Sequence, residues 1–101
     1  MTDMTVAKTI LEQLGGGLFA RMTGAKRFTG GADSLTMSVA GRNENGAVNR
    51  VRVTLDPSDT YTIESFYCRG TNAAERFKES DVYCDCLQDA FLRATGLYTK
   101  F

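Results

Sequence analysis

The sequence predicts an α+β fold, a two-layer sandwich in which an antiparallel meander of three to four strands is flanked by an N-terminal and a C-terminal helix. Three observations lead to this prediction. Apolar residues recur at helical spacing near both ends of the chain, they alternate with polar residues in the middle, and turn residues separate the alternating segments. The length of 101 residues predicts a single α+β domain over residues 1–101.

The first predicted helix runs from about Asp3 to Leu14. Val6, Ile10 and Leu14 recur every fourth residue and make one apolar stripe. After this helix, imperfect alternation predicts a short strand over residues 18–23. The glycine content of residues 24–33 then predicts a loop.

The central strands carry the clearest signal. Apolar residues alternate with polar ones in two successive segments, first Leu35, Met37 and Val39, then Val51, Val53 and Leu55. The dipeptide Asn45-Gly46 between them is a strong hairpin signal. Residues 56–59 (Asp-Pro-Ser-Asp) predict a type I turn, because Pro favours its second position.

A further strand begins with the alternating pair Tyr61 and Ile63. The consecutive apolar residues Phe66, Tyr67 and Cys68 interrupt its period, which predicts a bulge near Ser65 or burial on both faces. The polar side chains of these strands, among them those of Arg50, Arg52 and Glu64, are then expected on the uncovered face of the sheet.

The C-terminal third is predicted to be helical. Asn72 and Glu75 have the spacing of a capping box, which predicts a helical turn over residues 73–78. Ser80 is the expected N-cap of a second helix over residues 81–95, and Gly96 is its expected terminator. The predicted core consists of Val6, Ile10, Leu14, Leu35, Met37, Val39, Val51, Val53, Leu55, Tyr61, Ile63, Tyr83, Leu87 and Phe91.

Composition excludes several classes of function. Lys plus Arg and Asp plus Glu both number 12, so the chain lacks the bulk positive charge that holds many proteins on nucleic acid or membranes. It contains 0 His, which removes the commonest general base and metal ligand. The segment Gly24-Ala25-Lys26 does not complete a phosphate-binding loop motif. We therefore predict a protein that is not an enzyme and uses no cofactor.

The 3 cysteines predict free thiols rather than a metal site. An odd number of cysteines, and an acidic start without an apolar signal segment, favour the reducing cytoplasm. Cys84 and Cys86 stand two positions apart on the predicted helix and point in different directions, so they cannot chelate one ion together. Cys68 is distant in sequence.

The candidate binding residues are basic. Between Gly17 and Leu55 basic residues outnumber acidic ones, whereas acids dominate from Asp56 to Leu92, which predicts a basic and an acidic side of the folded chain. The strongest candidates for a binding surface are Lys26, Arg27, Arg50 and Arg52. The aromatic residues Phe28, Phe66 and Tyr67 could stack on bases if they lie nearby.

Three segments resemble a group of small proteins encoded by bacteriophages and other bacterial mobile elements. They are Thr5–Gly16, Asn49–Leu55 and Asp89–Thr99, and the likeness is weakest over residues 42–48 and 71–79. The resemblance implies an accessory protein in the cytoplasm of a bacterial host cell. It assigns neither an activity nor site residues. Proteins of that setting often bind a host or viral macromolecule, and some inhibit a host defence enzyme.

Taken together, these observations predict a binding module for a protein partner. Separate basic and acidic segments suit recognition of a charged protein surface. The alternative is a single-stranded nucleic-acid-binding protein that uses the arginines of its sheet. Self-association through the apolar tail Leu97–Phe101 is compatible with both, and no membrane contact is expected.

Overall fold

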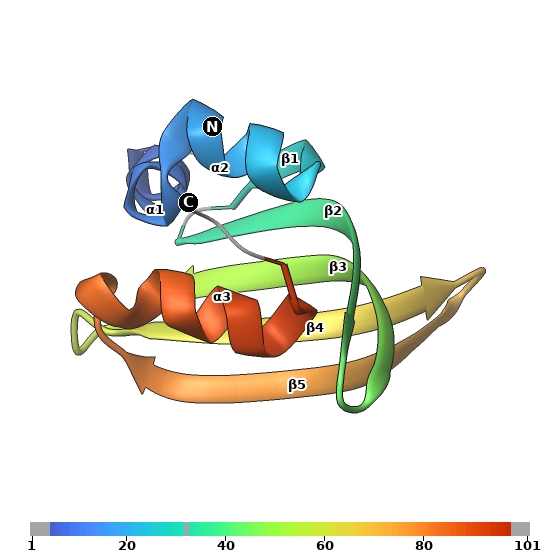
Figure 1. Ribbon diagram of the computed structural model, residues 1–101. Coiled ribbons are helices and arrows are strands. Elements are labelled where there is room, and N and C mark those ends of the chain that lie inside the picture. Colours follow the sequence, from blue (N-terminus) through green and yellow to red (C-terminus); the bar gives the residue numbers. More distant parts are fainter. Residues whose placement is uncertain (1–4, 32, 98–101) are drawn as a thin grey trace.

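The computed structural model, which describes residues 5–31 and 33–97, is built on one antiparallel sheet with the strand order β1-β2-β3-β4-β5 (Figure 1). The elements in chain order are α1 (Thr5–Leu14), α2 (Gly16–Thr23), β1 (Lys26–Gly30), β2 (Ser34–Asn43), β3 (Gly46–Leu55), β4 (Tyr61–Arg69), β5 (Asn72–Val82), the short 3₁₀ helix η1 (Cys84–Cys86) and α3 (Leu87–Thr95). The predicted α+β class and meander are confirmed. The sheet is larger than predicted, because it has 5 strands.

The helices cover one face of the sheet. Helix α3 lies across β2, β4 and β5, and α1 packs on β2 and on α3 (Figure 1). The alternation of the central strands directs their apolar residues to this face. Buried members of the predicted core are Ile10, Leu14, Leu35, Met37, Val39, Val51, Val53, Tyr61, Ile63, Leu87 and Phe91, and Val6 and Leu55 are partly buried against them.

Residues 18–23 form part of helix α2, so the strand predicted there is wrong. Phe19 is fully buried, and its ring meets that of Phe91 edge to face at a centroid distance of 4.9 Å. At the end of the helix, the Thr23 hydroxyl donates a hydrogen bond to the Phe19 carbonyl and accepts one from the Ala25 backbone N–H. Burial of one large aromatic residue against α3 thus decides the conformation of a segment whose own pattern is ambiguous.

The loop predicted over residues 24–33 is also wrong, because Lys26–Gly30 forms the edge strand β1. Four of its five residues are exposed, so it shows no alternation of apolar and polar residues. It pairs with β2 with one extra residue between Lys26 and Thr29, which makes a β-bulge. An edge strand of this kind is held by backbone pairing, which leaves little trace in the sequence.

The helical turn predicted over residues 73–78 is wrong in the same way. This segment lies within β5, which pairs with β4 from Arg69 opposite Asn72 to Tyr61 opposite Val82. Its Ala, Glu, Arg and Lys residues favour helix locally, but pairing with β4 overrides that preference. The irregularity predicted near Ser65 is confirmed, since the β4–β5 register shifts between Ser65 and Phe66.

The last helix begins later than predicted. Ser80 and Asp81 belong to β5, and the α-helix starts only at Leu87, after η1. Asp81 therefore does not lie at a helix N-terminus. Tyr83 is 64% exposed, which contradicts its predicted place in the core. The end of the helix is as predicted, because Gly96 adopts φ 71 at its C-cap.

The β2–β3 hairpin curls around the C-terminal end of α3 (Figure 1). A register shift between Ser38 and Gly41 bends the hairpin, and the Asn43 side chain donates a hydrogen bond of 2.8 Å to the Ala94 carbonyl. Gly41 approaches the Thr95 carbonyl so closely that a β-carbon would clash. The hairpin and the end of α3 therefore form one closely packed unit.

Some predictions fall at the ends of the chain. The start of the first helix at Asp3 and the tail beyond Leu97 lie outside the described residues, whereas Leu97 itself packs on the core. In the part of the chain that is described, no helix has the length and apolar character needed to cross a membrane.

Candidate binding surface on the open face of the sheet

The face of the sheet turned away from the helices, here called the open face, is polar. Along β2 and β3 the residues between the buried ones pair across the strands, with Ser38 opposite Arg50 and Thr36 opposite Arg52. On the next strand Glu64 lies opposite Arg52. Partners in register point to the same face, so alternation alone places these side chains together. The predicted location of Arg50, Arg52 and Glu64 is confirmed.

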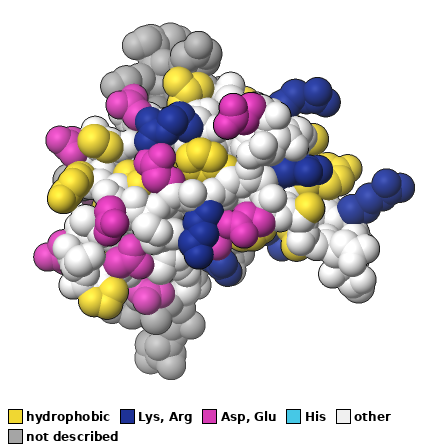
Figure 2. Space-filling view, turned by 90° about the horizontal axis from the view of Figure 1, so that it is seen from below, with side chains coloured by type: hydrophobic (Ala, Val, Ile, Leu, Met, Phe, Trp, Pro, Cys, Tyr) yellow, Lys and Arg dark blue, Asp and Glu magenta, His cyan; other side chains and the backbone are white. Residues whose placement is uncertain are grey.

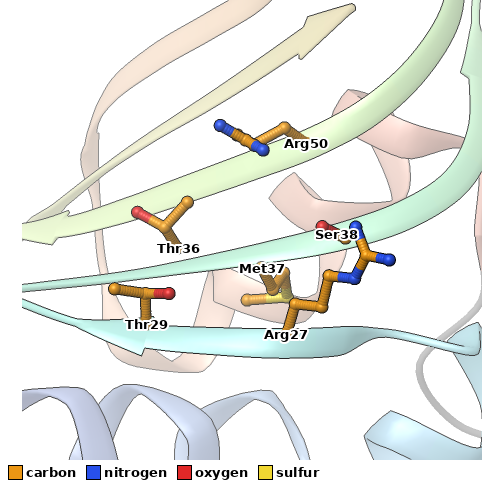
Figure 3. Close-up of a pocket in the computed structure, with 6 residues that line it drawn as sticks. All are labelled: Arg27, Thr29, Thr36, Met37, Ser38 and Arg50. Carbon is orange, nitrogen blue, oxygen red and sulfur yellow. The ribbon is translucent and has the colours of Figure 1, made fainter. Parts of the chain in front are cut away.

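A pocket of about 350 Å³ lies on this face, over β1, β2 and β3 (Figure 3). Figure 3 shows Arg27 extending from β1 toward Ser38 of β2, with Arg50 projecting from β3. The pocket is lined by Arg27, Thr29, Thr36, Met37, Ser38 and Arg50. Its polar lining consists of two guanidinium groups and three hydroxyl groups, all of which can donate hydrogen bonds.

The position of Arg27 depends on the β-bulge in β1. Arg27 has a φ of 57°, in the left-handed region that non-glycine residues rarely adopt. It occupies the stretch between Lys26 and Thr29 where β1 has one residue more than β2. Bulges of this kind redirect side chains. The structure thus accepts an unfavourable backbone conformation at a residue whose guanidinium lines the pocket.

Among the described residues, none forms an ion pair with the two arginines of the pocket. Neither Arg27 nor Arg50 forms a side-chain hydrogen bond with another described residue. No Asp or Glu is among the described residues that line the pocket. Both arginines are exposed, so water solvates them at present. An anion entering the pocket would meet two positive charges without displacing a carboxylate.

The other two predicted binding residues have different surroundings. The Arg52 guanidinium donates hydrogen bonds of 3.0 and 3.2 Å to Glu64 Oε1. It also lies over the Phe66 ring, 5.6 Å from the centroid. Lys26 is exposed at the start of β1, opposite Ser38 and next to the pocket. The structure therefore brings Arg27 and Arg50 together in one pocket, places Lys26 beside it, and engages Arg52 with Glu64.

The aromatic residues do not form a free stacking platform. Phe66 is half-buried under Arg52, and Tyr67 is half-buried with Arg76 over its ring at 5.5 Å. Phe28 is 38% exposed in the bulge of β1. Stacking of bases on Phe66 or Tyr67 would have to displace a guanidinium group from the ring.

On the face of the molecule seen in Figure 2, charged side chains of opposite sign are gathered at different ends. Figure 2 shows acidic side chains gathered at one end, where β5 ends and α3 begins in Figure 1, and basic side chains mostly at the other. Arg21 lies on α2 and Arg42 on the β2–β3 hairpin beside α3, and neither lines the pocket. The basic residues before Leu55 are thus divided between both layers.

Among the described residues, the cysteines take part in no metal-binding cluster. Cys68 and Cys86 are free, and no described group of three or more His, Cys, Asp or Glu residues could hold a metal ion. Cys84 and Cys86 lie on η1 rather than on the predicted α-helix. The negative charge of Asp85, followed by partial desolvation, raises the pKa of the Cys86 thiol above its ordinary value. A raised pKa makes this thiol a poor nucleophile at neutral pH.

The hydroxyl groups of the pocket were only partly accessible to prediction. Alternation along β2 places Thr36 and Ser38 on the polar face, but nothing in the sequence joins them to Thr29, which falls in the predicted loop. The two-layer fold with one uncovered sheet face defines the structural class of the protein. The chain matches no protein-family model, and no curated protein or solved structure is significantly similar to it. The resemblance to phage-encoded proteins therefore stays a prediction.

Proposed function

We propose that the protein is a non-enzymatic binding module that recognises an acidic surface of a protein partner through the open face of its sheet. The observation that carries this proposal is the pair of exposed arginines, Arg27 and Arg50, which have no acidic partner among the described residues. Charges left uncompensated on a rigid sheet raise the association rate and the specificity for a complementary partner.

A protein partner is favoured over single-stranded nucleic acid by two features. Proteins that bind single strands combine basic grooves with exposed aromatic rings. Here the rings of Phe66 and Tyr67 are each covered by an arginine. In addition, the formal net charge of the chain is zero, so no general attraction to phosphate backbones exists. The exposed Phe28 beside the pocket is the observation that keeps nucleic acid as the second candidate.

The biological setting follows from the sequence resemblance. A role as an accessory protein of a phage or mobile element, in the cytoplasm of a bacterial host, is compatible with a small module of this kind, and inhibition of a host defence system is one such role. The non-enzymatic part of the proposal rests on the absence of His from the sequence.

Affinity capture from bacterial lysate tests the proposal. Wild-type protein is compared with the double variant Arg27→Glu plus Arg50→Glu, each with and without nuclease treatment. We expect a stoichiometric protein partner that survives nuclease and is lost with the double variant. Charge reversal turns two attractive contacts into repulsive ones, so retention should fall by more than about tenfold.

Arg42→Glu is the matched control, since it changes the charge of an exposed arginine on the hairpin beside α3, away from the pocket. This variant should retain the partner. Equal capture by all variants would contradict the proposal. Recovery of nucleic acid alone, with affinity falling steeply as salt rises, would favour the second candidate.

A further inference from the structure

We infer that the pocket between Arg27 and Arg50 is a binding site for a phosphate monoester dianion. The inference rests on the proposed function in one respect, because it takes the open face as the recognition surface. It goes further by naming the chemical group that the pocket binds. The phosphate monoester could belong to a phosphorylated protein side chain or to a small phosphorylated molecule. Both ligands would present the same dianionic group to the pocket.

The charge of the pocket matches a dianion. Two guanidinium groups line it, and no carboxylate is among its described lining residues. A phosphate monoester carries between one and a half and two negative charges near neutral pH, whereas a phosphodiester or a carboxylate carries one. Of these three groups, only the monoester carries a charge close in size to the summed charge of the two arginines. Arginine is also the side chain best suited to phosphate, because its planar group donates two parallel hydrogen bonds.

The remaining lining supplies donors for the other oxygen atoms. Thr29, Thr36 and Ser38 contribute three hydroxyl groups from two neighbouring strands. Thr36 and Ser38 are half-buried, so their positions are set by the sheet. A tetrahedral phosphate has more acceptor oxygens than a planar carboxylate and can engage hydroxyl groups and both guanidinium groups together. The volume of about 350 Å³ accommodates a phosphate with a small attached group.

The backbone of β1 gives an independent reason to regard the pocket as a built site. A left-handed conformation in a residue other than glycine is unfavourable, and such conformations cluster at functional sites. Arg27 has this conformation at the bulge, with φ 57. A bulge of the same kind with glycine at this position would avoid the cost but would remove the guanidinium group from the pocket.

An NMR titration of the isolated protein tests the inference. Methyl phosphate, a monoester, is added to ¹⁵N-labelled protein at about pH 7.5, where the monoester is mostly a dianion. Dimethyl phosphate, a diester, and sodium chloride at the same ionic strength are the comparisons. We expect saturable shifts of the backbone amides of Thr29, Thr36 and Ser38 with methyl phosphate, and affinity at least about tenfold weaker for the diester.

Variants locate the binding site. Arg50→Gln and Arg27→Gln each remove one charge and keep a polar side chain, and each should weaken methyl phosphate binding by about tenfold or more. Arg42→Gln removes the same charge outside the pocket and should leave the affinity unchanged. Unchanged amide shifts in the core of each variant show that it is folded. Non-saturating shifts, or shifts of equal size in all variants, would overturn the inference.

Two further ligands distinguish the sources of the monoester. Tighter binding of a phosphoserine peptide than of methyl phosphate identifies a phosphorylated protein, and tighter binding of a nucleoside 5′-monophosphate identifies a small molecule. Preference for an oligonucleotide without terminal phosphate would overturn the inference. If methyl phosphate fails to bind but the Arg27→Glu plus Arg50→Glu variant still loses its protein partner, the phosphate site is refuted and the proposed function stands. If methyl phosphate binds but no protein partner is captured, the proposed function is refuted and the phosphate site stands.

Discussion

Two glycines that cap helices offer a matched test of how the fold is packed. Gly24 ends α2 with φ 69 and ψ 15, and Gly96 ends α3 with φ 71 and ψ 11. Their backbones are almost identical, but their surroundings differ. A β-carbon on Gly24 would meet no atom within 4 Å, whereas one on Gly96 would clash with the carbonyl oxygen of Arg42 in the β2–β3 hairpin.

The two substitutions to alanine should therefore differ in a predictable way. Both place a non-glycine residue in the left-handed region, which lowers the free energy of unfolding by roughly 1–2 kcal/mol. Both also raise it by about 0.4–1 kcal/mol, because alanine lowers the conformational entropy of the unfolded chain. Gly24→Ala should lower the free energy of unfolding by about 1 kcal/mol. Gly96→Ala adds overpacking of roughly 1–3 kcal/mol. The neighbouring hydrogen bond from Asn43 to Ala94 holds the hairpin against α3 and limits relaxation.

Urea denaturation followed by circular dichroism measures the free energy of unfolding of both variants and of the wild type. In thermal melts, a loss of about 1 kcal/mol in the free energy of unfolding lowers the Tm by about 4–8 °C in a domain of this size. The Tm of Gly96→Ala should therefore lie at least about 4 °C below that of Gly24→Ala. An equal loss of unfolding free energy in the two variants would refute the reasoning. Glycine at residue 96 would then not be required by the close approach of the hairpin to α3.

Three other predictions concern single side chains. Ser65→Ala should raise the free energy of unfolding, measured by urea denaturation, by about 1 kcal/mol. The reason is that the fully buried Ser65 Oγ has no hydrogen-bond partner among the described residues. A lower free energy of unfolding in this variant would contradict the prediction and indicate a partner for the hydroxyl. In a Cys68→Ser, Cys84→Ser background, alkylation of Cys86 by iodoacetamide should be slow at neutral pH, because a raised pKa leaves less thiolate at any given pH. Asp85→Asn removes the main cause of the raised pKa, so the pH midpoint of alkylation should move down, and an unchanged midpoint would contradict this cause. Arg52→Ala should lower the free energy of unfolding by less than about 1 kcal/mol, and this loss should be smaller in high salt. The reason is that the Arg52 side chain, which pairs with Glu64, is 47% exposed. A larger loss that does not depend on salt would instead indicate that packing of Arg52 on Phe66 stabilises the fold.

The candidate site shows where prediction from sequence ends. Alternation along β3 correctly places Arg50 and Arg52 on the polar face, and the basic segment before Leu55 includes Lys26 and Arg27. The sequence does not predict that Arg52 pairs with Glu64 while Arg27 and Arg50 line a pocket. The pairing of Arg52 with Glu64 depends on the β3–β4 register. The presence of Arg27 and Arg50 in the lining of one pocket depends on a bulge in a strand that is predicted to be a loop.

By itself, the sequence determined the α+β class, the central meander and most of the core. These features leave a local periodic signal, because buried residues alternate with less buried ones over Leu35–Val39, Val51–Val53 and Tyr61–Ser65, and one side of α3 is buried. Tertiary structure alone decided α2, β1 and β5. Phe19 of α2 is buried in the core, where its ring meets that of Phe91 from the other end of the chain. Most residues of the edge strands are exposed, and backbone hydrogen bonds to a neighbouring strand, which require no particular side chain, pair them with the sheet. Of the described residues of β5, only Phe77 and Val82 add apolar contact with the core.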